Sequence, residues 1–111
     1  MQVLKLTAFT GGWVVGDFSP AIIENSELEV AVKSYTEGAR EPLHHHKLAR
    51  EVTIIVSGEA RMNGMLVSEG DVVVLEPGEH SDFEAVTRCL TTVIKTPSVP
   101  GDKYLGVAGY E

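Results

Sequence analysis

The feature that most constrains this sequence is the regular recurrence of turn-forming dipeptides. They occur along the whole chain, at Gly11-Gly12, Ser19-Pro20, Glu37-Gly38, Glu41-Pro42, Ser57-Gly58, Asn63-Gly64, Glu69-Gly70, Pro77-Gly78 and Pro100-Gly101. The runs between them are short and rich in Val, Ile, Leu and Thr, which is the pattern of many short strands. No window carries a capped apolar helical stripe of roughly ten residues or more. The chain is therefore predicted to be all-β, as a sandwich or a closed barrel.

We predict strands in residues 2–8, 12–16, 28–36, 51–57, 59–62, 65–67, 72–75, 80–87 and 89–96. Asn63-Gly64 is the clearest hairpin signal, because both residues tolerate the positive φ angles of a two-residue type I′ turn. The run Val72–Leu75 is apolar at every position, so it is predicted to be buried on both faces.

Two aromatic residues receive predictions that the structure can test. In residues 28–36, strand alternation places Tyr35 on the same face as Glu29 and Lys33. Because that face is polar, Tyr35 is predicted to lie on the surface or in an interface. Trp13 is predicted to be a core or interface residue.

Length, charge and cysteine content limit the class of protein. With 111 residues, the chain is predicted to form a single domain, residues 1–111. The formal net charge of −7 gives no electrostatic reason to bind nucleic acid or an anionic membrane. Cys89 is the single cysteine, which fits a reducing compartment, and it is expected to pack as a small hydrophobe. We see neither a signal-peptide pattern nor a membrane-spanning stretch, so we expect a cytoplasmic protein.

The residues that carry chemistry lie in and just after a histidine cluster. His44, His45 and His46 are consecutive. In extended chain, His44 and His46 point to one face and His45 to the other, out of a barrel. Glu51 begins the next apolar run and can return beside the pair as an oxygen ligand. Two imidazoles and one carboxylate suit a divalent Fe, Mn, Ni, Co or Zn ion, and they leave positions open for substrate or water.

The spacing around this cluster resembles the first motif of the cupin family, which sets a His-x-His pair and a glutamate between two glycines. Here Gly38, five residues, His44-x-His46, four residues, Glu51, six residues and Gly58 match that motif. The resemblance covers roughly residues 28–96 and implies a jelly-roll β-barrel of two antiparallel sheets. It also implies that His44, His46 and Glu51 bind the metal inside the barrel, usually with a fourth histidine.

The second cupin motif is matched in part, by Gly70 and by Pro77-Gly78. His80 stands one position before the usual histidine slot, which Ser81 occupies. A shift of one residue along a strand turns a side chain to the opposite face, whereas a local bulge would restore it. We therefore keep His80 as the candidate fourth ligand, with Ser81, Asp82 or water as alternatives.

Three functions remain open at this point. The first is a metal-dependent enzyme, an oxygenase or an isomerase, acting on a small polar metabolite. The stretches at residues 12–18 and 97–104 resemble small cupins of sugar or nucleotide-sugar metabolism. The second is a barrel that binds or senses a small molecule without catalysis. The third is a metal-free enzyme like the sugar epimerases, in which a His and a Tyr exchange protons with the substrate, although the complete His-x-His and Glu set would then have no purpose.

The resemblance to cupins also implies how the chain assembles. Small cupins often pair through an outer sheet, so we expect a homodimer. Residues 2–8 and the polar tail after residue 96 are the candidate exchange elements.

Overall fold

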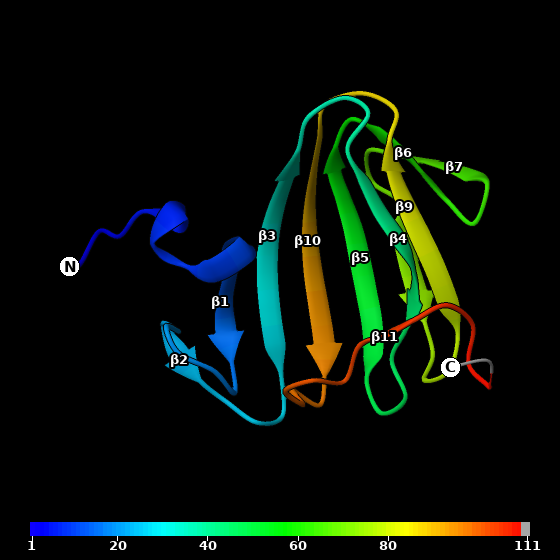
Figure 1. Cartoon of the computed structure of the whole chain (residues 1–111). Helices are drawn as coiled ribbons and strands as arrows, with labels where there is room; N and C mark the ends of the chain where they lie inside the picture. The colour runs from blue at the N-terminus through cyan, green and yellow to red at the C-terminus, as the bar shows by residue number, and fades with distance from the viewer. Residues whose placement is uncertain (110–111) are drawn as a thin grey trace.

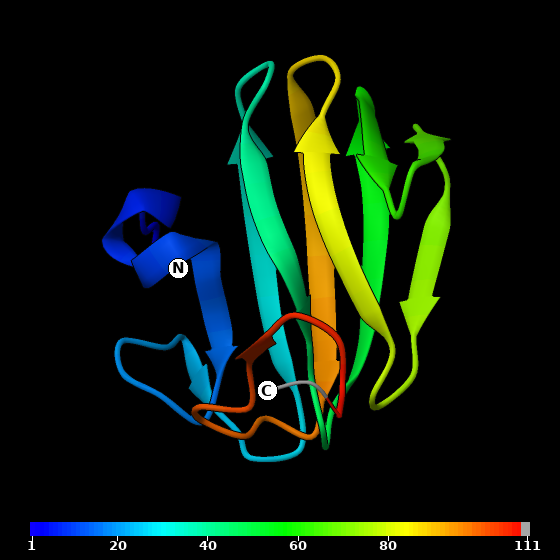
Figure 2. The ribbon, with the colours of Figure 1, turned by 45° about the vertical axis from the view of Figure 1, so that its right-hand side comes forward.

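The strands of this computed structural model, which describes residues 1–109, form two sheets (Figure 1). The larger sheet contains β1 (Trp13–Gly16), β2 (Ile23–Glu24), β3 (Glu29–Tyr35), β5 (Arg50–Ser57), β8 (Val72–Leu75) and β10 (Cys89–Thr96), in the order β2-β1-β3-β10-β5-β8. The smaller sheet contains β4 (Arg40–His45), β6 (Glu59–Met62), β7 (Met65–Ser68), β9 (His80–Ala85) and β11 (Tyr104–Leu105), in the order β11-β4-β9-β6-β7. Figure 2 shows β4 and β9 lying in front of the larger sheet. The predicted all-β fold of two sheets is confirmed.

The apolar core fills one end of the space between the sheets. Its buried members come from both sheets and are Ile55, Ala60, Met62, Val67, Phe83, Ala85 and Cys89. Cys89 is 1% exposed and packs there as a small hydrophobe, as predicted, and burial raises the pKa of its thiol. Since this cluster closes one end, the other end of the barrel is left for polar side chains.

Two turns carry the backbone geometry that the sequence predicts. Met62 of β6 pairs with Met65 of β7, so Asn63 and Gly64 form a two-residue turn, with φ angles of 51° and 75°. The predicted hairpin is therefore confirmed. Gly58, between β5 and β6, has a φ of 84°, and a Cβ atom there would lie 2.0 Å from the carbonyl oxygen of Arg88. Only glycine fits such a close approach of two backbones.

The predicted strand in residues 2–8 is not present. Part of it forms the 3-10 helix η1 (Leu6–Ala8), which a second one, η2 (Thr10–Gly12), follows. The segment projects away from the barrel in Figure 1. Among its apolar side chains, Met1, Val3, Leu4 and Leu6 are exposed, because the segment pairs with no strand. Within residues 1–109, no helix is long and apolar enough to cross a membrane.

Other strands also differ from the sequence prediction, since β2, β4 and β11 were not predicted. β4 was not expected, because Pro42 weakens the strand signal of its residues. The predicted burial of β8 on both faces is wrong, since Val72 and Val74 are 57% and 48% exposed. β8 forms an edge of the larger sheet, and only its other face turns toward the smaller sheet.

β3 turns its polar face toward the interior of the barrel. Lys33 and Tyr35 line the interior cavity, and Glu29 is only 9% exposed. Alternation then directs Val30 and Val32 outward. The prediction that Tyr35 lies on the surface is therefore wrong, and the reason is that this end of the barrel holds a polar site in place of apolar core.

Candidate metal centre

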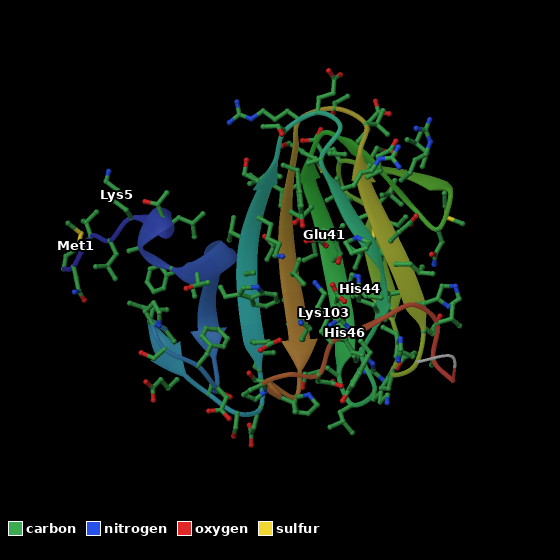
Figure 3. The ribbon with its side chains drawn as sticks, in the orientation of Figure 1. Met1, Lys5, Glu41, His44, His46 and Lys103 are labelled. Carbon is green, nitrogen blue, oxygen red and sulfur yellow. The ribbon has the colours of Figure 1, made fainter. Side chains whose placement is uncertain are left out.

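The structure brings His44, His46 and Glu51 together between the two sheets. His44 lies on β4, His46 directly follows that strand, and Glu51 lies on β5. One potential ligand atom from each residue lies within 4.8 Å of the other two. The two imidazole rings are nearly perpendicular, at 88°, with centroids 5.4 Å apart, and Figure 3 shows both side chains beside β4. The three donor groups can therefore contact one ion.

The Glu51 carboxylate lacks a hydrogen-bond partner on one oxygen. Its side chain is 13% exposed, and Oε2 lies 3.3 Å from Nδ1 of His46. This oxygen nevertheless accepts no hydrogen bond from the described residues. Burial raises the pKa of Glu51, although the charge of Lys95 opposes the shift. A buried carboxylate oxygen without a partner is costly, and a bound cation would remove that cost.

Each histidine has a nitrogen that can act as a ligand. Nδ1 of His44 lies 2.8 Å from the carbonyl oxygen of Pro42 and donates to it, so Nε2 keeps its lone pair. In His46, burial and then the charge of Lys95 lower the pKa to about 4. His46 is therefore neutral at pH 7, which is the form that binds metal ions.

This donor set fits a divalent transition-metal ion. Two imidazoles and one carboxylate are a common set for such metals, and they leave coordination positions open. The unpartnered oxygen of Glu51 is the second sign of fit. Fe, Mn, Ni, Co and Zn all accept these donors, so the residues do not select among them.

An interior cavity of about 100 Å³ borders the three residues. Its wall also includes Trp13 from β1, Lys33 and Tyr35 from β3, Lys95 from β10 and Lys103 from the C-terminal segment. Sequence reasoning missed the functional position of all five. Strand alternation alone gives two faces, and it does not say which of them turns inward.

Comparison with known proteins gives one kind of match. Neither a protein-family model nor a curated protein matches the chain. Among solved structures, an uncharacterized conserved protein with a double-stranded β-helix domain from Klebsiella pneumoniae aligns with a TM-score of 0.71 and 17% identity, over 96% of this chain and 92% of that chain. An RmlC-like cupin from Shewanella frigidimarina aligns with a TM-score of 0.64 and 22% identity, over 68% of this chain and 71% of that chain. The chain has the cupin fold.

A third match is a sugar phosphate isomerase from a cupin superfamily, from Silicibacter pomeroyi. It aligns with a TM-score of 0.64 and 20% identity, over 73% of this chain and 57% of that chain. At these identities the likeness concerns the fold. Within this cupin fold, the His-x-His pair and Glu51 occupy the interior that the motif implies.

The candidate second-motif histidine, His80, does not join the cluster. β4 pairs with β9 so that His44 is opposite Ser81 and His45 is opposite His80, with no register shift between the two pairs. Ser81 is 2% exposed and lines the cavity, whereas the residues around the cavity do not include His80. The offset of one residue in the motif therefore persists in the fold, and the geometry does not support His80 as the fourth ligand.

The C-terminal segment holds the loop that follows His46. Asp102 is 6% exposed, and its carboxylate accepts hydrogen bonds from the backbone N–H groups of Lys47, Leu48 and Ala49, at 2.9–3.3 Å. The backbone N–H of Gly78 donates to the carbonyl oxygen of His46, at 2.7 Å. Sequence reasoning did not identify Asp102, because its partners lie more than fifty positions away.

His45 lies outside the cluster, as its alternation with His44 predicts. It is fully buried all the same. Nδ1 of His45 lies 2.8 Å from the carbonyl oxygen of Gly106, and the ring stacks on Tyr104 with centroids 5.5 Å apart. The C-terminal segment therefore packs against His45, and through β11 it pairs with β4 of the same chain.

Proposed function

We propose that this cupin is a metal-dependent enzyme that acts on a small polar metabolite, with His44, His46 and Glu51 holding one divalent metal ion. The observation that carries the proposal is the convergence of the three donors beside a cavity, with an oxygen of Glu51 left without a hydrogen bond. When bound, such an ion supplies Lewis acidity toward a substrate oxygen.

The residues of the cavity wall supply the remaining chemistry. Glu41 accepts hydrogen bonds from Nζ of Lys33 at 3.2 Å and from the hydroxyl of Tyr35 at 3.1 Å. Burial alone would raise the pKa of Glu41, but the nearby charge of Lys33 and these hydrogen bonds lower it overall. Glu41 is thus ionised at neutral pH and faces the cavity. In this proposal it accepts a proton from the substrate.

The class of reaction is proposed as isomerisation, which needs a proton acceptor of this kind. The solved cupin structures that resemble this chain include a sugar phosphate isomerase, which supports a small sugar-derived substrate. An oxygenase is the alternative within the same proposal, since the donor set also suits iron.

A barrel that binds or senses a ligand without catalysis is the second candidate function. It would use the same cavity of about 100 Å³, which holds only a small molecule or part of one. The metal-free epimerase-like alternative is less well supported. Its Tyr must exchange a proton, whereas burial and the charge of Glu41 raise the pKa of Tyr35 well above its usual value.

Elemental analysis of protein purified without a histidine tag tests the metal site. The matched control is the double variant His44→Ala/His46→Ala. We expect close to one equivalent of metal in the wild type and none in the variant. Equal metal content in the two proteins would contradict the assignment, and no metal in either would favour a metal-free barrel. If the metal is iron, the oxygenase becomes the first reaction to assay; zinc, nickel or manganese would favour the isomerase.

A further inference from the structure

Three lysines reach the wall of the cavity that the proposed metal ligands share. They are Lys33 of β3, Lys95 of β10 and Lys103 of the C-terminal segment. The side chains of Lys33 and Lys95 are only 22% and 13% exposed. Largely buried ammonium groups are uncommon unless anions face them, so Lys33 and Lys95 each need a negative partner, whereas Lys103 is exposed.

The single tryptophan, Trp13, lies between two of these lysines. Nζ of Lys95 lies 4.8 Å from the centroid of a Trp13 ring, and Nζ of Lys33 lies 5.5 Å from it. Each of the two lysines also has one carboxylate partner, Glu41 for Lys33 at 3.2 Å and Glu29 for Lys95 at 3.1 Å. Their charges are therefore matched one to one by the protein.

Lys103 differs from the other two. Its side chain is exposed, and among residues 1–109 it forms no hydrogen bond or ion pair, although its charge contributes to the lowered pKa of Glu41. Its neighbour Asp102 is anchored to the loop after His46, which keeps the Lys103 backbone at the mouth of the site. Figure 3 shows Lys103 beside His44 and His46. Lys103 thus places an exposed positive charge, without an ion-pair partner among these residues, at the wall of the cavity.

The charges around the cavity, together with a bound metal ion, would favour an anionic ligand. The cavity wall holds three lysines and three carboxylates, those of Glu41, Glu51 and Asp82, and Glu29 adds a fourth carboxylate beside Lys95. The Asp82 carboxylate is already used, since it accepts a hydrogen bond from the backbone N–H of Asn63 at 2.7 Å. A divalent ion on the three ligands would add two positive charges, so the loaded site would be positive overall.

We infer that the ligand of this cavity is a small organic anion, whose carboxylate or phosphate group is bound by Lys103, with Lys33 and Lys95 beside it. This inference deepens the proposed function and rests on it for the identity of the site as the reaction centre. The contacts to the anion come from the lysines, whereas the net positive charge of the site also needs the bound metal ion. The negative net charge of the chain, −7, makes a local positive cavity selective for small anions rather than for polyanions.

The fluorescence of Trp13 provides the test, because this residue is the only tryptophan and contacts two of the lysines. The probes are malonate, methylphosphonate and the neutral malonamide, titrated into metal-free and metal-loaded protein. The variant is Lys103→Met. The control is Lys5→Met, which removes a charge from the projecting N-terminal segment shown in Figure 3.

We expect at least one of the two anions to bind and malonamide not to bind. Lys103→Met is expected to weaken anion binding by about tenfold or more, the factor for the loss of one charge-assisted hydrogen bond, with Lys5→Met unchanged. The better of the two anions then identifies the group as carboxylate or phosphate. Equal affinity in Lys103→Met and wild type, binding of malonamide as tight as that of malonate, or no binding of either anion would overturn the inference.

The metal content measured on the same samples separates the two proposals. Anion binding that depends on Lys103 in a protein that takes up no metal would leave the anion site standing and contradict the metal-dependent function. Metal uptake without anion binding would support the metal site and contradict the anion site.

Discussion

The ammonium group of Lys95 lies 3.2 Å from Nε2 of His46. Since His46 is neutral at pH 7, Lys95 donates to the lone pair of this nitrogen. A metal ion that binds there must displace the hydrogen bond and must lie close to a positive charge. Lys95 therefore opposes metal binding, and the protein keeps it in place with Glu29 at 3.1 Å.

The variant Lys95→Met is expected to bind divalent metal more tightly, by about tenfold or more, because a nearby like charge is removed. Calorimetric titration with Zn²⁺ or Co²⁺ measures the change, with Lys5→Met as the control for net charge. A weaker affinity in Lys95→Met would show that Lys95 orients His46 rather than competing for it.

Two single variants, His46→Ala and His80→Ala, test which of these histidines binds the metal ion. His46→Ala is expected to abolish tight metal binding, because it removes one of the two nitrogen donors. His80→Ala is expected to leave the affinity unchanged, because the register places Ser81, and not His80, opposite His44. Metal content and affinity of the two variants test this pair. A clear loss of affinity in His80→Ala would place that side chain at the metal after all.

Asp102→Asn is expected to lower the free energy of unfolding by about 2 kcal/mol, since hydrogen bonds to a charged acceptor are lost or weakened. The carboxylate accepts from three consecutive backbone N–H groups, and an amide side chain offers only one acceptor oxygen. Urea unfolding measures the stability, and metal affinity measured in parallel reports on the loop after His46. Exposed Asp71→Asn is an informative comparison, because its carboxylate accepts one short-range bond, from Ser68.

The raised pKa of Tyr35 predicts how the free energy of unfolding changes at alkaline pH. Burial, followed by the charge of Glu41, raises the pKa of its hydroxyl above 10.0, so the folded chain keeps a proton that the unfolded chain releases. Stability is therefore fully present below pH 10 and falls as the pH rises beyond it, by up to about 1.4 kcal/mol per pH unit. Urea unfolding between pH 8 and 11 should show a steeper loss for the wild type than for Tyr35→Phe, with Tyr104→Phe as control. Parallel curves for wild type and Tyr35→Phe would contradict the shift.

We expect a homodimer that forms through the outer face of the larger sheet. By register, Val30, Ile94, Val52 and Val74 form one row across four strands. Val72 and Val74 at the edge are 57% and 48% exposed. An exposed apolar face suits a second copy of the chain. Light scattering should give twice the mass of 12.0 kDa for the wild type and a monomer for Val72→Glu/Val74→Glu. A monomeric wild type at micromolar concentration would contradict the expectation.

Much of the site could be read from local patterns. Turn dipeptides depend on the φ angles of one or two residues, so Asn63-Gly64 and Gly58 were predictable without knowledge of the fold. The spacing of His44, His46 and Glu51 was also informative, because alternation within one extended segment puts both histidines on one face. The lysines of the cavity and Asp102 were not predictable in this way, since each acts on residues far along the chain.

The all-β class, the turns and the choice of three candidate donors all follow from the sequence alone, because these depend on backbone preferences and on spacing over a few residues. Only the tertiary structure decided which face of β3 turns inward, so that Tyr35 and Lys33 line the cavity while Val30 and Val32 face outward. It also decided that Ser81 and not His80 is opposite His44. The physical reason is the same in both cases. A strand has two faces that alternate with every residue, and the pairing of strands distant in sequence chooses between them.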